Sequence, residues 1–345
     1  MKIRLPLLIV LLALAGLVLS ACGPQATPEP AAQPDASSTS ADTAATSPTE
    51  ETVAEPTAEP TLPPQRSADE VTITDGLGRD VTIAANPQRI VSLAASVTEI
   101  VFAVGAGDRL VGRDEFSDYP PEALDVESIG SLFPNVNAEA VVALQPDLVI
   151  AAGITNPDDV NALAQLGLNV FATRFDVTIQ DIYADILDVG ELTGQSEAAE
   201  EVVGDMQARM QAVQNATGAA ERPVVFYEID ATEPSKPWTA GTGTFIDTLI
   251  EMAGGENAGG SASDYFQISL EELVAQDPQI IVLGSSTFGG QTPELVAARE
   301  GWGDIAAVQD GAIYTFDDNL VSRPGPRIVD GLEALARIIH PDLFE

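Results

Sequence analysis

Short apolar runs alternate with segments of helical spacing along most of this chain. Residues 89–93 and 224–229 are typical runs, and each predicts a buried strand. Residues 96–104 carry apolar side chains at helical spacing and stop at Gly105, with Ser96 expected to cap the helix. Strands that alternate with helices predict an α/β fold with a mainly parallel sheet.

Two stretches of this pattern repeat each other. Residues 137–151 align without gaps with residues 269–283, so that Glu139 falls on Glu271 and Pro146 on Pro278. Each copy predicts a short helix, a turn that contains proline and a buried strand. The repeat therefore predicts two similar lobes, each with one acidic residue in the same place.

A longer helical pattern separates the two copies. Residues 179–193 predict one helix, which breaks near Gly194, and a second helix runs from Ser196, its expected cap, to about Gly218. About 20 helical residues span roughly 30 Å, enough to join two lobes as a stiff strut. The predicted domains are an N-terminal lobe (69–178), a helical linker with the bridging helix (179–218) and a C-terminal lobe (219–345).

The first residues have the pattern of an export signal. Lys2 and Arg4 precede an apolar run over residues 5–19, so residues 1–21 predict a signal peptide. The run ends in Leu-Ser-Ala-Cys, which resembles the bacterial lipobox and implies lipid attachment at Cys22. The alternative is an uncleaved membrane anchor with an incidental cysteine. Residues 22–68 are rich in Pro, Ala, Thr and Glu, and they predict a disordered tether.

Composition excludes several classes of function. The formal net charge of −38 would repel phosphate backbones, so nucleic-acid binding is not expected. One cysteine and one histidine, His340, leave no internal disulfide and no zinc site rich in Cys or His. Nucleophile-elbow, zinc-protease, P-loop and dinucleotide motifs are absent from the sequence. We therefore expect no enzyme, no resident metal and no cofactor.

Candidate ligand contacts are aromatic side chains in loops near strand ends, where parallel α/β sheets bind ligands. They are Phe116, Phe133, Trp238 and Phe266. Ordinary packing is the alternative for each of them. Arg174 follows a predicted strand, and pairing with nearby carboxylates is favoured over an anionic ligand. The Gly- and Thr-rich loop 237–244 predicts a helix cap in preference to an anion site.

Several segments together resemble the periplasmic binding proteins of ABC importers for cobalamin, ferric siderophores and haem, over nearly all of the chain from residue 71. The segments are Arg89-Ile-Val-Ser-Leu, Ser96-Val-Thr-Glu99, Ser117-Asp-Tyr-Pro-Pro121, Asn137-Ala-Glu139, Gln145-Pro-Asp-Leu-Val-Ile150, Ala253-Gly-Gly-Glu-Asn257, Ser269-Leu-Glu271 and Arg323-Pro-Gly-Pro-Arg327. The resemblance implies two similar Rossmann-like lobes joined by one long backbone helix, with a shallow ligand cleft between them. It also implies an extracytoplasmic protein, and we expect a monomer.

The same resemblance implies a partner. In this family one glutamate per lobe docks onto arginines of the importer's permease dimer, and those glutamates align with Glu139 and Glu271. A carboxylate–arginine contact is charge-assisted, so two of them would orient the cleft over the permease. The alternative is that each glutamate only suits the first turn of its helix.

The ligand is less constrained by the resemblance. Residues 117–120 and the four aromatic side chains are most similar to the cobalamin-binding branch. However, Phe116 and Phe133 stand where that branch has tyrosine and tryptophan, and Ala95 replaces a common proline. A ferric siderophore is the alternative, with Arg174 or Arg323 meeting its anionic groups, and Arg323 is therefore counted among the ligand-binding candidates. Haem and a non-transport sensor or scaffold on the same fold are further alternatives.

Overall fold

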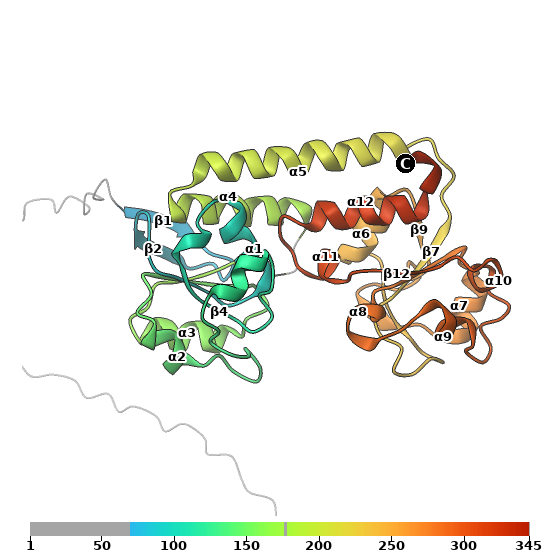
Figure 1. The fold of residues 1–345 in the computed structure, drawn as a ribbon, viewed down its shortest axis with the longest axis horizontal. Helices are drawn as coiled ribbons and strands as arrows, with labels where there is room; N and C mark the ends of the chain where they lie inside the picture. The colour runs from blue at the N-terminus through green and yellow to red at the C-terminus, as the bar shows by residue number, and fades with distance from the viewer. Residues whose placement is uncertain (1–69, 176–177, 345) are drawn as a thin grey trace, which may run out of the picture. The chain divides into compact units, whose positions relative to one another are not determined.

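The two copies of the sequence repeat lie in two α/β lobes of one computed structural model, which describes residues 70–175 and 178–344 (Figure 1). The predicted signal peptide, the lipid-attachment residue Cys22 and the predicted tether lie outside the described residues. Within them, the α/β fold with two similar lobes and one long backbone helix is confirmed.

The N-terminal lobe contains a four-stranded parallel sheet in the order β4-β3-β5-β6. Its strands are β3 (Ile90–Ser92), β4 (Leu110–Arg113), β5 (Leu148–Ala151) and β6 (Val170–Ala172). Its helices are α1 (Ala95–Ala103), α2 (Ala138–Ala143) and α3 (Pro157–Gln165), with 3-10 turns at Gly107–Arg109 and Pro121–Asp125. A hairpin precedes the sheet, in which β1 (Glu70–Thr74) pairs antiparallel with β2 (Asp80–Ala84).

The C-terminal lobe repeats this plan with a parallel sheet in the order β12-β11-β7-β9. Its strands are β7 (Val224–Glu228), β9 (Glu256–Asn257), β11 (Ile280–Leu283) and β12 (Ile313–Thr315), and an antiparallel pair is formed by β8 (Trp238–Ala240) and β10 (Tyr265–Gln267). Its helices are α6 (Phe245–Met252), α7 (Leu270–Gln276), α8 (Ser285–Gly289), α9 (Pro293–Ala297), α10 (Ala306–Asp310), α11 (Asn319–Ser322) and α12 (Ile328–Ile339), followed by a 3-10 turn at Pro341–Leu343.

The two sheets have the same topology. Numbered along the chain within each lobe, both sheets run second, first, third, fourth strand. The repeated segments supply the third strand of each sheet, β5 and β11, together with the helix before it. The sequence repeat is therefore the visible part of a duplicated lobe.

Two helices connect the lobes. The helix α4 (Ile179–Thr193) starts with a reciprocal capping box between Thr178 and Asp181 and ends at Gly194, which has the positive φ of 68° that glycine tolerates best. The helix α5 (Ser196–Thr217) packs against both α4 and α12 (Figure 1). Its buried apolar face is part of a hydrophobic core that also includes residues of both lobes. The predicted strut is therefore confirmed as a packed helix.

Two predicted caps are wrong. Ala94 precedes α1 and Gln195 precedes α5, and neither helix start has a side-chain cap. The helix α1 starts two residues earlier than a cap at Ser96 would require, and α5 starts one residue earlier than a cap at Ser196 would require, so both serines lie within their helices. His340 follows α12, and its Nε2 lies 3.2 Å from the carbonyl oxygen of Gly254, in the loop after α6.

Candidate functional site

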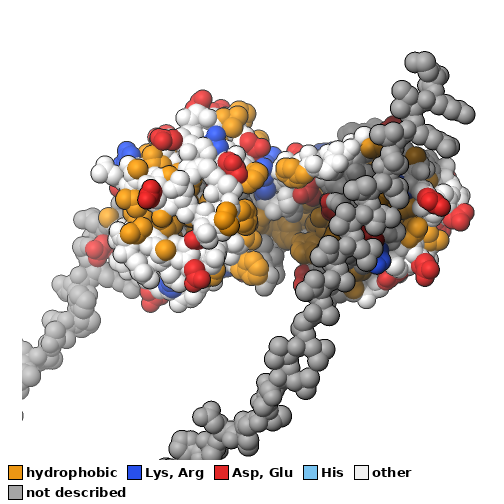
Figure 2. Space-filling view, turned by 90° about the horizontal axis from the view of Figure 1, so that it is seen from below, with side chains coloured by type: hydrophobic (Ala, Val, Ile, Leu, Met, Phe, Trp, Pro, Cys, Tyr) orange, Lys and Arg blue, Asp and Glu red, His pale blue; other side chains and the backbone are white. Residues whose placement is uncertain are grey.

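Seen from below, the surface of the described residues is hollowed between the two lobes, and hydrophobic side chains gather in the hollow and on the adjacent face of the N-terminal lobe (Figure 2). Both lobes have parallel sheets whose third strand lies beside the first, so each has a switch point between those two strands. Ligands of parallel α/β sheets bind beyond the carboxyl ends of strands at such points. This hollow is the candidate ligand site.

The loop after β4 carries the first predicted aromatic residue. Phe116 is half exposed, and its backbone N–H donates to the Asp114 carboxylate at 3.0 Å. The Ser117 hydroxyl contacts Asp114 and lies 2.7 Å from the hydroxyl of Thr98 on α1. Burial raises the pKa of Asp114, while the Ser117 hydrogen bond opposes that rise. The loop is thus anchored to α1 of its own lobe through Ser117, the residue after Phe116.

The second predicted aromatic residue of this lobe, Phe133, is the most exposed of the four, at 68%. It lies between Ser131, whose hydroxyl accepts from the Phe133 N–H at 3.2 Å, and Pro134, shortly before α2. Its side chain makes no stacking contact with another described aromatic ring. An exposed phenyl ring without such a contact is available to an apolar ligand face.

The β8–β10 pair changes the prediction for the C-terminal lobe. Trp238 is opposite Gln267, so Trp238 shares a face with Gln267 and Tyr265, whereas Phe266 is opposite the fully buried Thr239. Trp238 is 41% and Tyr265 is 47% exposed, but Phe266 is half-buried against the lobe's own hydrophobic core. The exposed aromatic pair on this hairpin is therefore Trp238 and Tyr265. Phe266, predicted from the sequence as a ligand contact, faces the other side of the strand from Tyr265, because side chains alternate along a strand.

Tyr265 lies in an acidic neighbourhood. Burial raises its pKa, and the negative charges of Asp318 and Asp264 raise it further. Asp318 accepts a 2.7 Å hydrogen bond from the hydroxyl of the buried Tyr227. The Tyr265 phenol is consequently held in its neutral form, which is a hydrogen-bond donor as well as an aromatic surface.

Arg323 is placed differently from the prediction. Its Nη1 lies 2.6 Å from Asp118 Oδ1 and 3.3 Å from Glu99 Oε1, both in the N-terminal lobe, and its side chain is only 12% exposed. Arg327 donates to both oxygens of Glu99, from Nε at 2.9 Å and from Nη2 at 2.6 Å. The guanidinium of Arg327 also lies 3.9 Å from the ring centre of Tyr119. We call these five residues the interlobe cluster: Glu99, Asp118, Tyr119, Arg323 and Arg327.

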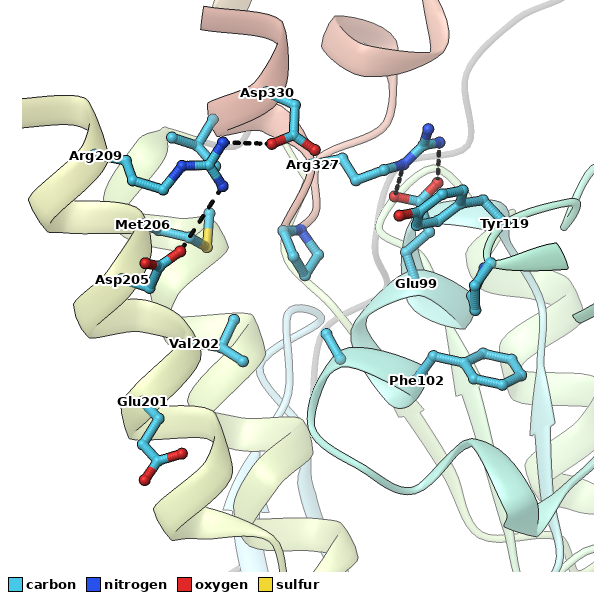
Figure 3. A pocket seen from close by; sticks show the side chains of 14 residues that line it. Glu99, Phe102, Tyr119, Glu201, Val202, Asp205, Met206, Arg209, Arg327 and Asp330 are labelled. Atoms are coloured by element: carbon cyan, nitrogen blue, oxygen red, sulfur yellow. Dashed lines mark hydrogen bonds and ion pairs between the residues drawn. The ribbon is translucent and has the colours of Figure 1, made fainter. Parts of the chain in front are cut away.

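Three residues of the interlobe cluster, Glu99, Tyr119 and Arg327, line one wall of a cavity of about 560 Å³ between α1, α5 and α12. Figure 3 shows Glu99 and Tyr119 beside Arg327 on one side and Met206 and Arg209 of α5 on the other. None of the five predicted ligand-binding residues lines this cavity. The hollow between the lobes therefore remains the candidate ligand site.

For Arg174 and for the loop before α6, the structure shows the alternative that the sequence favoured over an anion site. Arg174 pairs with Asp185 at 2.5 Å and Asp188 at 2.9 Å, as local pairing predicted. At the end of the predicted loop 237–244, the Thr244 hydroxyl accepts from the Asp247 N–H at 3.2 Å and caps α6. Sequence reasoning did not single out Glu99 or Asp118, although both lie in segments that carried the family resemblance.

Glu139 and Glu271 are exposed on the surfaces of the two lobes. Each is the second residue of its helix, after the caps Asn137 and Ser269. Neither carboxylate has an ion pair or a side-chain hydrogen bond within residues 70–175 and 178–344. The neighbouring Glu272 is different, because it accepts from the Ser261 hydroxyl at 2.6 Å. The repeated glutamates are thus free to contact another molecule.

Two similar lobes, a bridging helix and a hollow in which hydrophobic side chains gather define a two-lobed solute-binding protein. The chain belongs to the periplasmic binding protein family, whose model matches residues 90–320. This is a family of transport rather than of catalysis, and its members act outside the cytoplasm. Among the described helices, none is both long and apolar enough to pass through a membrane.

Individual relatives are similar over most of their length. An uncharacterised ABC transporter substrate-binding lipoprotein of Bacillus subtilis is 34% identical, over 80% of this chain and 87% of its own. A cobalamin-binding protein of Halobacterium salinarum is 31% identical, over 81% and 78%. A solved structure of a possible iron-binding protein from Staphylococcus epidermidis has a TM-score of 0.66 and 26% identity, over 74% of this chain and 99% of that one.

Proposed function

We propose that this protein captures a corrinoid in the hollow between its lobes and delivers it to the permease dimer of an ABC importer. The observation that carries the ligand assignment is the set of exposed aromatic side chains contributed by both lobes: Phe116 and Phe133 from one, Trp238 and Tyr265 from the other. A corrinoid is a broad, largely apolar macrocycle with polar edges, and such a body is bound by large apolar rings. The cobalamin-binding relative from Halobacterium supports this class of ligand.

Glu139 and Glu271 are proposed to dock the protein on the permease. Their support is their equivalent position in the two lobes, their exposure and their lack of a partner among the described residues. A free carboxylate at the same point of each lobe matches a partner with two equivalent basic sites, as a permease dimer would offer.

Attachment to the membrane is proposed at Cys22. The Leu-Ser-Ala-Cys sequence supports it, and the Bacillus relative is named a lipoprotein. Acylation there would keep the binding protein on the membrane face that carries its importer, while the 22–68 segment would give it reach.

An iron chelate is the second candidate ligand. The structural similarity to a possible iron-binding protein favours it, and Tyr265 offers a phenol on the exposed face of its hairpin. A ferric siderophore would use the same hollow, with the same docking and anchoring.

Tryptophan fluorescence tests the ligand directly, because Trp302 is fully buried and Trp238 is exposed. The purified protein is titrated with cobalamin, cobinamide, ferric siderophores and haem, and a Trp238→Phe variant corrects for absorption by the coloured ligands. We expect saturable quenching by the two corrinoids at micromolar concentration or below. Quenching by a siderophore alone would select the second candidate, and no saturable binding of any of them would contradict the importer function.

A further inference from the structure

The segment from Arg323 to Arg327 joins the lobes at one place. It connects α11 to α12 in the C-terminal lobe, and both of its arginines contact Glu99, more than 220 residues away in the sequence. Gly325 lies against α1, where an added Cβ would be 3.4 Å from the Ser96 carbonyl oxygen. Pro324 and Pro326 restrict the backbone on either side of it. The segment is therefore stiff and close to the neighbouring lobe.

The contact to Glu99 is the buried part of the interlobe cluster. The Glu99 side chain is 1% exposed, and Arg327 contacts both of its oxygens. This is the bidentate geometry that arginine and carboxylate groups favour. Removing one partner of such a pair leaves a charge buried and unpaired, so the two lobes are held together firmly at this point.

The contact to Asp118 has a different consequence. Asp118 is 56% exposed and lies in the loop after β4, two residues from Phe116. Arg323 therefore holds that loop from the opposite lobe, while Thr98 and Ser117 hold it from its own lobe. Phe116 directly precedes both attached residues in the chain.

We propose that Arg323 and Arg327 are positioning residues for ligand capture. Arg327 fixes the separation of the lobes through Glu99, and Arg323 fixes the 114–121 loop and its Phe116 through Asp118. The hollow is thereby preset before a ligand arrives, which reduces the ordering cost of binding. The effect on ligand capture rests on the proposed function. The effects of Arg327 on the lobe separation and of Arg323 on the loop do not.

Lobe separation is measured without ligand in the full-length chain. Spin labels are placed on exposed positions of the two lobes through Asp158→Cys and Asp310→Cys, with Cys22→Ser removing the native thiol. We expect one narrow distance distribution for the parent, a broadened or longer one for Arg327→Gln, and an unchanged one for Arg323→Gln. Arg337→Gln is the matched control, because Arg337 lies on α12, the helix that directly follows Arg327, is exposed and makes one weak contact to Glu333. An Arg327→Gln distribution equal to that of the parent overturns the role of Arg327.

Loop order is measured by hydrogen exchange on the same proteins. Arg323→Gln should accelerate exchange of the amides in 115–119 by at least about fivefold without changing the cores of the two lobes, since only a local contact is lost. Arg323→Lys, which can still reach Asp118, should restore part of the protection. Acceleration spread evenly over the chain, or none in the loop, overturns the role of Arg323.

Ligand titration then separates this inference from the proposed function. If the parent binds a corrinoid, Arg323→Gln should weaken the affinity by about tenfold, the cost of losing one charge-assisted contact that orders the loop. An unchanged affinity overturns the role in capture. A parent that binds none of the ligands contradicts the proposed function alone, and the distances and exchange rates still decide whether the cluster positions the lobes and the loop.

Discussion

Glu139 and Glu271 occupy the same position in two lobes of the same topology, 132 residues apart. Each is the second residue of the helix that precedes the third strand of its sheet, and each is exposed. A duplicated acidic residue of this kind places two equal charges on the surface, one for each lobe.

Replacing both glutamates by alanine should abolish ligand uptake in cells and leave ligand affinity unchanged. The two side chains have no described partner whose loss would disturb the fold, so the variant should also unfold like the parent. Uptake of labelled ligand and the fluorescence titration are the two measurements. Glu272→Ala is the control and should keep uptake, and a loss of ligand affinity in Glu139→Ala/Glu271→Ala would show that the docking role is misassigned.

The register of the β8–β10 pair predicts opposite effects for two adjacent aromatic residues. Tyr265→Ala should weaken ligand binding by about tenfold, because an exposed ring on the face of Trp238 is lost. Phe266→Leu should leave affinity unchanged and lower the free energy of unfolding by about 1 kcal/mol, since it changes packing in the core. The reverse pattern in titration and chemical unfolding would restore Phe266 as the ligand contact.

A buried ion pair predicts a large stability effect in the C-terminal lobe. Glu228 is fully buried at the end of β7, where it accepts from Arg299 and, at 2.7 Å, from the Ser285 hydroxyl. Arg299→Met should lower the free energy of unfolding by about 3–5 kcal/mol, because the Glu228 charge stays buried without its partner.

The double change Glu228→Gln/Arg299→Met is the control for this pair. It removes both charges and should recover much of the lost stability, with the coupling measured by a double-mutant cycle in denaturant. Equal losses in the single and double variants would mean that packing around Arg299, including its contact to Trp302 at 4.5 Å, causes the effect.

Asp185 predicts a pH dependence of stability. Burial raises the pKa of its carboxyl from 3.8 to about 6, although the charge of Arg174 opposes the rise. Between these values the folded protein binds the proton more tightly than the unfolded chain does, so the contribution of this group is fully present below about pH 4 and is lost by about pH 6. The difference in unfolding free energy between parent and Asp185→Asn should therefore fall by up to about 3 kcal/mol over that window. A difference that does not change with pH, in denaturant unfolding at several pH values, would contradict the assignment.

The sequence by itself determined the plan of the molecule. Apolar runs and helical spacing depend only on local side-chain order, so they predicted the strands, the bridging helix and the duplicated lobe, and they marked Glu139 and Glu271 as equivalent. Arg174 was correctly expected to pair with nearby carboxylates because acidic residues are frequent around it in the chain.

Only the tertiary structure decided which aromatic side chains are exposed and which residues Arg323 contacts. Which ring of Tyr265 and Phe266 is exposed depends on pairing with β8, a segment more than 20 residues earlier, and a shift of one residue exchanges the two faces. The partners of Arg323, Glu99 and Asp118, lie more than 200 residues away. Contacts at such separations arise from the packing of the two lobes against each other, and no local pattern in the chain records them.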